Sequence, residues 1–199
     1  MAAHTATVFA TDRYRARELR EDDVPLLQAL LEANPEYSLA VNGRRPHPDE
    51  AFVEFVEQPP AHLQPGRRWF MGLFDADDTL VGVCVVVENL GAPRVWHLAW
   101  LLVATALHGS GAAQAVYDAM EAWARRGGAQ WLRLGVVQGN ARAERFWERQ
   151  GFLQVRTREG MDTGGRLNTI RVMAKPLEGG TLAGYLALMP RDQPGSTLP

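Results

Sequence analysis

The sequence holds a single cysteine, Cys84, among its 199 residues. No disulfide can form within the chain, and a zinc site built on several cysteines is excluded. Long apolar runs are also missing, because no segment approaches the ~20 apolar residues that a membrane-spanning helix needs. Residues 1–12 have neither a basic start nor an apolar run, so they do not resemble a signal peptide. We therefore expect a cytoplasmic protein with no bound metal.

Neither sign of charge predominates in the composition. Lys and Arg number 21, Asp and Glu number 23, and the formal net charge is -2. A nearly neutral chain gives no electrostatic reason to expect nucleic acid or a membrane as a partner. Hydrophobic residues make up 46% and charged residues 22%, which excludes a disordered chain and a coiled-coil rod. The length fits one domain with its own core.

Hydrophobic periodicity and breaker residues predict one α/β layer structure in the order β-α-α-β-β-β-α-β-α-β-β. The predicted strands are 14–18, 68–74, 80–88, 95–103, 131–137, 152–157 and 168–175. The predicted helices are 22–34, 49–57, one that opens on Gly109 and reaches Arg125 or Arg126, and 142–150. Residues 36–48 are predicted as a polar loop, and 181–189 as one further short element.

A tight turn after strand 95–103 carries the first signal of ligand binding. It reads His108-Gly109-Ser110-Gly111-Ala112-Ala113 and opens a helix. Small residues allow a ligand to approach the backbone, and the first N–H groups of a helix lack internal acceptors. The turn therefore suits a diphosphate, although an ordinary turn has the same composition. It is not a P-loop, because no Lys-Ser/Thr pair follows, and its glycine spacing does not match a dinucleotide fingerprint.

A second pattern follows strand 131–137. It reads Asn140-Ala141-Arg142-Ala143-Glu144-Arg145-Phe146-Trp147-Glu148-Arg149-Gln150-Gly151-Phe152. Asn140 is a good helix N-cap, and Gly151 is a good C-cap. Capping and core packing alone would also explain these residues.

Taken together, the two patterns resemble the GNAT superfamily of N-acyltransferases. Its members carry Gln/Arg-x-x-Gly-x-Gly/Ala at a helix start, and some 30 residues on they carry Asn-x-x-Ala-x-x-Phe-Tyr-x-x-x-Gly-Phe. The resemblance implies a single GNAT domain over residues 13–176, with an N-terminal extension (1–12) and a C-terminal tail (177–199). It also implies a mixed, mostly antiparallel sheet flanked by helices, in which a splayed strand pair forms an acyl-CoA cleft.

The resemblance also implies roles for particular residues. The turn would hold the diphosphate of coenzyme A on backbone N–H groups of His108, Gly109, Ser110, Gly111, Ala112 and Ala113. Leu101 and Val103 would pair their backbone with the thioester carbonyl and the pantetheine arm. Further along the chain, Asn140 would bind the pantetheine, Phe146 and Trp147 would line the thioester end, and Arg142 would reach a phosphate.

Two residues depart from the family pattern. His108 stands where Gln or Arg is usual, and we expect little effect because the diphosphate is mainly a backbone ligand. Trp147 stands where many relatives have the Tyr that protonates the leaving thiolate. An indole N–H donates a hydrogen bond but is not a usable acid. A thiol of pKa ~8.5 can leave as the thiolate, so the tyrosine is helpful rather than obligatory.

In this interpretation an amine attacks the thioester directly, and the Leu101 N–H stabilises the developing oxyanion. A base or a chain of water molecules must take a proton from the amine. Glu88 is the candidate base, and an exposed strand-end carboxylate without this role is the alternative. Candidate contacts to the acceptor are Glu36, Tyr37, Arg44 and His97, and for His97 a core role is the alternative.

We therefore expect an acetyl-CoA-dependent N-acetyltransferase whose acceptor is a primary amine of a small molecule. Two alternatives stay open: a non-catalytic module that senses acyl-CoA, and an acetyltransferase of protein lysines or N-termini. The tail, residues 177–199, could pack on its own domain or on a second copy in a homodimer.

Overall fold

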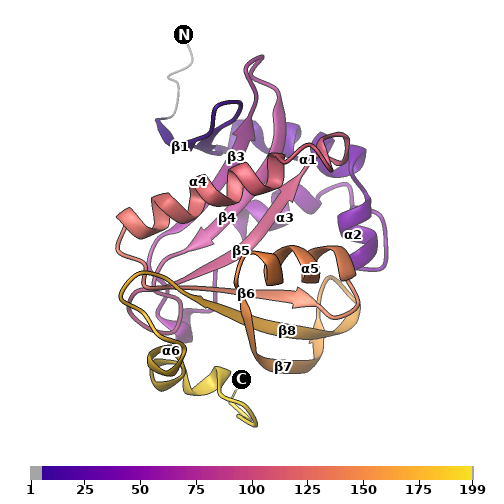
Figure 1. Cartoon of the computed structure of the whole chain (residues 1–199). Helices are drawn as coiled ribbons and strands as arrows, with labels where there is room; N and C mark the ends of the chain where they lie inside the picture. The colour runs from indigo at the N-terminus through magenta and orange to yellow at the C-terminus, as the bar shows by residue number, and fades with distance from the viewer. Residues whose placement is uncertain (1–5, 199) are drawn as a thin grey trace.

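The computed structural model describes residues 6–198 of the chain. Within them, eight strands form one open sheet in the order β1-β2-β3-β4-β5-β6-β8-β7 (Figure 1). The strands are β1 Thr7–Ala10, β2 Arg15–Glu18, β3 Arg68–Phe74, β4 Leu80–Val87, β5 Val95–Val103, β6 Trp131–Val137, β7 Leu153–Asp162 and β8 Leu167–Pro176. Neighbouring strands are antiparallel except for the parallel pair β5 and β6. The predicted α/β fold with a mixed, mostly antiparallel sheet is confirmed.

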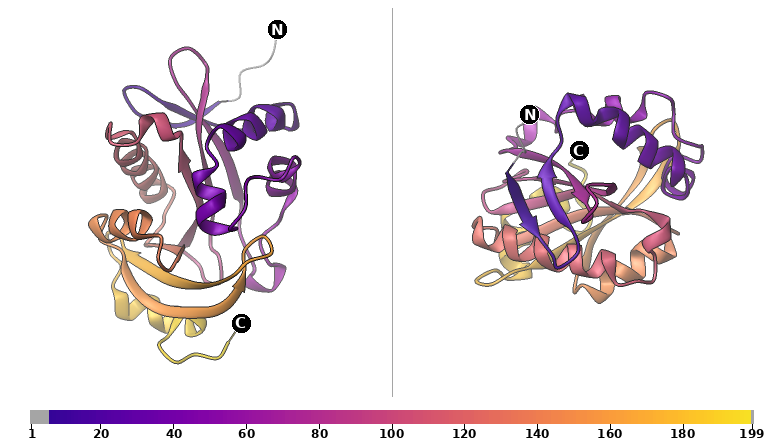
Figure 2. Two further views of the ribbon diagram at one scale, coloured as in Figure 1. Left: turned by 90° about the vertical axis from the view of Figure 1, so that its right-hand side faces the viewer. Right: turned by 90° about the horizontal axis from the view of Figure 1, so that it is seen from above.

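Helices cover both faces of this sheet (Figure 2). The helices are α1 Val24–Ala33, α2 Glu36–Val41, α3 Glu50–Val56, α4 Ala112–Arg126, α5 Ala141–Arg149 and α6 Leu182–Leu188. On one face, α1 and α3 pack on a core that includes Leu27, Val83 and Trp100. On the other face, α4 and α5 enclose a second core around Tyr117 and Trp147. Each face therefore has its own apolar layer, as a two-sided sheet requires.

The structure corrects the sequence prediction at three places. Residues 36–41 form the short helix α2, where a loop was predicted. Its ends carry no side-chain cap bond, which explains why the sequence lacks a start signal there. Residues 7–10 form strand β1 within the predicted N-terminal extension, of which residues 1–5 lie outside the described part. Strands β7 and β8 extend further than predicted and form a long antiparallel hairpin.

The feature that positions the site is the short contact between β5 and β6. The two strands pair over only three positions, Val95 with Trp131, Trp96 with Leu132 and His97 with Arg133. Beyond His97, an extra residue at Ala99 shifts the register of β5 against β4. A bulge of this kind bends its strand. The remaining halves of β5 and β6 stay apart, as the predicted splayed pair requires.

The C-terminal segment packs against its own domain. Trp131 Nε1 on β6 donates to the Thr181 carbonyl at 2.8 Å, and Tyr185 of α6 is fully buried. The segment ends in a 3-10 turn, Pro190–Asp192. Among the described residues, no helix combines the length and the apolar character that crossing a membrane demands.

Two neighbouring leucines of α1 test the core on the α1 and α3 face. Leu27 is fully buried, whereas Leu26 is 50% exposed. We expect Leu27→Ala to lower the free energy of unfolding by about 2–5 kcal/mol, because it leaves a cavity. Leu26→Ala, the same change one residue away, should stay within about 0.5 kcal/mol of the parent. Urea unfolding followed by circular dichroism measures both, and equal losses would contradict this core assignment.

Candidate functional site

A cavity of about 820 Å³ occupies the gap between β5 and β6. The ends of both strands form its walls, and the starts of α4 and α5 form its mouth. Its lining includes most of the residues predicted to bind coenzyme A: Leu101, Val103, His108, Gly109, Gly111, Ala112, Ala113, Asn140, Arg142, Phe146 and Trp147. The structure therefore brings together two sequence patterns that lie some 30 residues apart. Ser110, also predicted, does not line the cavity.

The turn before α4 leaves alternate N–H groups free. The N–H groups of His108, Ser110 and Ala112 are used inside the turn, on the Thr105 carbonyl, the Leu107 carbonyl and the Ser110 hydroxyl. Those of Gly109, Gly111 and Ala113 have no acceptor in residues 6–198. The prediction that the whole turn offers its amides is therefore corrected to these alternate positions, because the others hold the turn in shape.

Two glycines keep the space above these amides open. Gly109 and Gly111 have φ angles of 82° and 83°, a region that disfavours residues with a side chain. A Cβ atom built at either position would meet no other atom within 4 Å. The turn is thus a concave surface with free N–H donors at the positive end of a 15-residue helix. Its shape and charge suit an anion.

The backbone of β5 presents two peptide groups to the cavity. The Ala104 N–H donates to the Val81 carbonyl on β4 at 2.8 Å. Peptide groups alternate in direction along a strand, so those of Leu101 and Val103 point away from β4 and into the gap. The pairing with β6 has already ended at His97. The Leu101 N–H is therefore placed where the sequence analysis puts the oxyanion donor.

A histidine–arginine contact bridges the two sides of the mouth. His108 Nε2 lies 3.0 Å from the Val103 carbonyl, and Arg142 Nη1 lies 2.6 Å from His108 Nδ1. Because a guanidinium only donates, Nδ1 is the acceptor and Nε2–H bonds the carbonyl. His108 thus links β5 to α5, and it occupies the Val103 carbonyl that was predicted to pair with pantetheine. The N–H of Val103 still faces the cavity.

The aromatic residues of α5 form the opposite wall. Asn140 caps the helix, since its side-chain oxygen accepts from the Ala143 N–H at 3.3 Å. Phe146 and Trp147 stack edge to face, with ring centroids 4.8 Å apart. Trp147 also packs on Tyr117 and Phe152 in the core. The predicted capping and packing roles of these residues are therefore both present in the structure.

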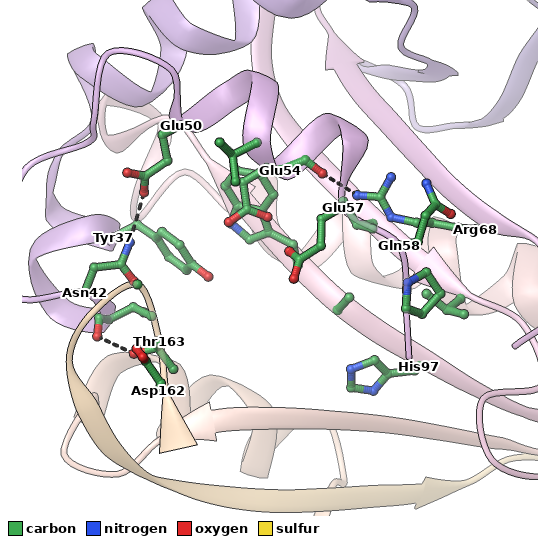
Figure 3. Close-up of a pocket in the computed structure, with 18 of the residues that line it drawn as sticks. Tyr37, Asn42, Glu50, Glu54, Glu57, Gln58, Arg68, His97, Asp162 and Thr163 are labelled. Atoms are coloured by element: carbon green, nitrogen blue, oxygen red, sulfur yellow. Dashed lines mark hydrogen bonds between the residues drawn. The ribbon is translucent and has the colours of Figure 1, made fainter. Parts of the chain in front are cut away.

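A second cavity, of about 590 Å³, opens on the α3 side of the sheet (Figure 3). It shares wall residues with the first cavity, so the two join where β5 bulges. The shared residues are Tyr37, Val41, His97, Ala99, Trp100 and Thr163. The second cavity thus adjoins the deep end of the first. Helix α2, which the sequence analysis missed, supplies part of this junction.

Carboxylates dominate the second cavity. Glu50, Glu54 and Glu57 follow one face of α3 and continue past its end, and Asp49 and Asp162 complete the set. Glu50 is neutralised by Arg44 at 2.6 Å. Arg68 also lies in this wall, where it donates to the backbone carbonyls of Glu54 and Phe55 rather than to a carboxylate. The spacing of the three glutamates, i, i+4 and i+7, is a signal in the sequence that places them on one helix face.

Glu54 has an unusual proton affinity. Burial raises the pKa of its carboxyl to about 7, and repulsion from Glu57 and Glu50 adds to this rise. Neither the Glu54 nor the Glu57 carboxylate has a hydrogen-bond or ion-pair partner among the described residues. Both point into the cavity in Figure 3. This wall therefore presents negative charge and one group that exchanges a proton near neutral pH.

The four predicted acceptor contacts fall in different places. Tyr37 and His97 line the junction, and Tyr37 packs on Trp100 with centroids 5.6 Å apart. Arg44 lines the second cavity but is paired with Glu50. Glu36 lies in the first cavity, where it accepts from the Thr105 hydroxyl at 2.9 Å. The structure thus gathers Tyr37, His97 and Arg44 at the second cavity and places Glu36 elsewhere.

Glu88, the predicted base, lies outside both cavities. Its carboxylate accepts from Trp69 Nε1 at 2.7 Å. Trp69 packs on the core under α4, on the face of the sheet opposite α3. The prediction is therefore corrected: one residue step along β4 turns a side chain to the other face, and Glu88 falls on the wrong one. Among the described residues, no group of three or more His, Cys, Asp or Glu side chains could hold a metal.

The model of the acetyltransferase (GNAT) family matches residues 26–152. The chain therefore belongs to the GNAT family, and it is an acyltransferase. Members of this family use acetyl-CoA as the acyl donor. No curated protein matches the chain significantly.

Solved structures of similar fold come from several bacteria. An acetyltransferase from Thermus thermophilus matches with a TM-score of 0.64 and 21% identity, covering 88% of this chain and 100% of that chain. A GCN5-related N-acetyltransferase from Kribbella flavida gives 0.60 and 24%, covering 82% and 98%. Spermidine N-acetyltransferase from Vibrio cholerae, in complex with CoA and spermine, gives 0.62 and 17%, covering 82% and 95%. At these identities the likeness establishes the fold.

The raised pKa of Glu54 predicts a pH-dependent stability. The carboxyl binds a proton more tightly in the folded chain, at a pKa of about 7 against 4.5. Its contribution to stability is therefore full below 4.5 and is lost as pH rises from 4.5 through 7. We expect Glu54→Gln to be more stable than the parent at pH 8 by about 3 kcal/mol and equal to it at pH 4.

Urea unfolding at both pH values measures this difference. The matched control is Glu178→Gln, which removes one negative charge from an exposed position. If the difference in unfolding free energy between Glu54→Gln and the parent is the same at pH 4 and at pH 8, the assigned pKa is contradicted.

Proposed function

We propose that this enzyme transfers an acetyl group from acetyl-CoA to a primary amine of a small molecule. The observation that carries the proposal is the junction of the two cavities at the bulge of β5. One cavity has the anion-binding turn and the free strand edge that a pantetheine thioester needs. The other has carboxylates that attract an ammonium group. The two ligands would meet beside the Leu101 N–H.

The first cavity fits coenzyme A residue by residue. The diphosphate would lie on the N–H groups of Gly109, Gly111 and Ala113. The pantetheine arm would extend β5 as an additional strand, bonded to the peptide groups of Leu101 and the N–H of Val103. Phe146 and Trp147 would cover the thioester end, and Asn140 and Arg142 would contact the arm and a phosphate near the mouth.

The reaction is a direct attack in a ternary complex. Glu54 takes a proton from the ammonium group, which a carboxyl of pKa about 7 can do near neutral pH. The amine nitrogen then forms a bond to the thioester carbon, while the Leu101 N–H stabilises the oxygen. The carbon–sulfur bond breaks and the coenzyme leaves as its thiolate. The second proton on the nitrogen, which the amide product must lose, passes through solvent to this thiolate. Trp147 can donate a hydrogen bond to the sulfur but no proton.

Among the structural neighbours, the spermidine N-acetyltransferase from Vibrio cholerae supports a small acceptor. The concave acidic cavity of about 590 Å³ also favours a small cation over a folded protein surface. A screen of primary amines for thiol release from acetyl-CoA tests the reaction. Tight coenzyme binding without thiol release would favour the sensing module, and a preference for peptides would favour a protein acetyltransferase.

A pair of glycine variants tests the coenzyme site. Gly111 and Gly128 both have positive φ, at 83° and 93°, and a Cβ at either meets no atom within 4 Å. Alanine at either position therefore costs similar backbone strain. Of the two, only Gly111 lies at the cavity. Alanine keeps the N–H, but its methyl group would occupy the open space through which a phosphate approaches. Gly111→Ala should therefore weaken CoA binding by about ten- to hundredfold, because a charge-assisted hydrogen bond is blocked. Calorimetric titration with CoA measures the effect. Equal CoA affinities for the two variants would contradict the assignment of this turn as the diphosphate site.

A pair of glutamate variants tests the base. Glu54→Gln should lower kcat by about a hundredfold and remove the rise of kcat/KM through pH 7. Glu88→Gln, the same change on the opposite face of the sheet, should leave both intact. A steady-state pH profile distinguishes them. If Glu88→Gln abolishes the ionisation and Glu54→Gln does not, the base is Glu88.

A further inference from the structure

A buried network connects the C-terminal segment to the junction of the cavities. Asp192, in the 3-10 turn after α6, is completely buried. It binds Arg133 of β6 through two hydrogen bonds, Nε to Oδ2 at 2.7 Å and Nη2 to Oδ1 at 3.1 Å. The Tyr185 hydroxyl donates to the same carboxylate. Arg133 is only 7% exposed, so its charge is compensated inside the protein rather than by water.

The free end of this arginine reaches His97. Arg133 Nη1 lies 3.3 Å from His97 Nδ1, and the two residues form the last pair of the β5–β6 ladder. The network therefore sits where the two strands part. His97 lines both cavities, and its Nε2 has no hydrogen-bond partner among residues 6–198. Nε2, the remaining polar atom of the ring, is therefore available to hydrogen-bond a ligand.

The chemistry of the contact determines the tautomer of His97. A guanidinium nitrogen only donates, so Nδ1 must accept with its lone pair and carries no proton. The single proton of the neutral ring then lies on Nε2. Burial and the charge of Arg133 lower the pKa of His97 to about 3, while Asp192 acts in the opposite sense and Arg191 in the same sense as Arg133. His97 is thus a permanent hydrogen-bond donor, and the amine's proton goes elsewhere.

We propose that His97, held by Arg133 and Asp192, selects acceptor amines that carry a hydrogen-bond-accepting oxygen besides the amino group. This inference rests on the proposed function and specifies its substrate class. A donor that hydrogen-bonded the attacking nitrogen would occupy the lone pair that must form the new bond. The partner of Nε2–H is therefore a second group of the substrate, a hydroxyl or carbonyl oxygen. His97 is the specificity residue, and Arg133 and Asp192 are positioning residues.

The charges around the junction favour the same orientation of the acceptor. Arg133 stands behind His97, and Arg158 lines the same cavity. The Glu54 and Glu57 carboxylates line the α3 side of the adjoining cavity. A cationic amino group is attracted to the carboxylates and repelled from the arginines. The oxygen end of the same molecule is therefore directed to His97.

The tautomer can be observed without any turnover. Long-range proton–nitrogen NMR of the intact chain labelled with nitrogen-15 at histidine reports which ring nitrogen carries the proton, and loss of the signal in His97→Gln assigns it. We expect His97 as the neutral Nε2–H form from pH 5 to 8, consistent with its depressed pKa. A protonated ring or an Nδ1–H form overturns the inference. Asp192→Asn should release Arg133 from its position beside His97. With folding verified by circular dichroism, the His97 signal of this variant should no longer correspond to the Nε2–H form alone.

Selectivity is measured by binding, with CoA present in place of acetyl-CoA so that no transfer occurs. Two pairs of amines of equal heavy-atom count serve as probes: ethanolamine against propylamine, and glycinamide against isobutylamine. The oxygen-bearing member of each pair should bind about three- to tenfold more tightly, the range of one hydrogen bond. His97→Leu should abolish the difference, and His97→Gln, which keeps an N–H donor, should retain part of it. CoA affinity should stay unchanged in both.

Equal binding within both pairs, or a preference that persists in His97→Leu, overturns the inference. A chain that shows the expected tautomer and selectivity but releases no thiol from acetyl-CoA with any amine would refute the proposed reaction and leave the role of His97 in binding intact.

Discussion

The early end of the β5–β6 ladder is the constraint on which the rest of the structure depends. Parallel neighbours in a sheet normally continue to exchange hydrogen bonds, because unpaired buried peptide groups are costly. Here pairing stops after His97 and Arg133, and the bulge at Ala99 bends β5 away. The peptide groups of Leu101 and Val103 are left facing a cavity. A ligand with its own amide groups can complete them, and this is the physical basis for the proposed pantetheine site.

The same separation explains how the rims of the cleft are held. The turn before α4 uses half of its N–H groups for its own conformation and keeps the alternate ones, at Gly109, Gly111 and Ala113, free. His108 and Arg142 then join this rim to α5 across the mouth. At the closed end, Asp192 and Arg133 brace the point where the strands diverge. The cleft is therefore fixed at both ends before any ligand arrives.

The sequence was sufficient for the parts of the site that depend on local chemistry. The glycines of the turn, the Asn140 cap and the apolar face of α5 each have a short-range signal, and the structure brings them to one cavity. Other parts are decided by contacts between distant residues. The side of the sheet on which Glu88 falls depends on strand alignment, and the partner of Arg133 lies 59 residues away in a segment that composition marks as a tail. The acidic face of α3 was predictable only in part. The spacing of its glutamates is visible in the sequence, but the cavity that they line is formed by residues distant in the chain.

Three separate parts of the chain thus divide the work of orienting an acceptor. In the proposed reaction, helix α3 supplies the negative wall, β5 supplies the oxyanion donor and His97, and the C-terminal turn supplies the carboxylate that holds Arg133 in place. Because the Glu54 and Glu57 carboxylates lie on the α3 side while Arg133 and Arg158 line the first cavity, a molecule with an amino group and an oxygen would have one favourable orientation at the junction. The nitrogen then lies toward Glu54, which can take its proton. A simple alkylamine lacks the second anchor, and its nitrogen would be positioned by charge alone.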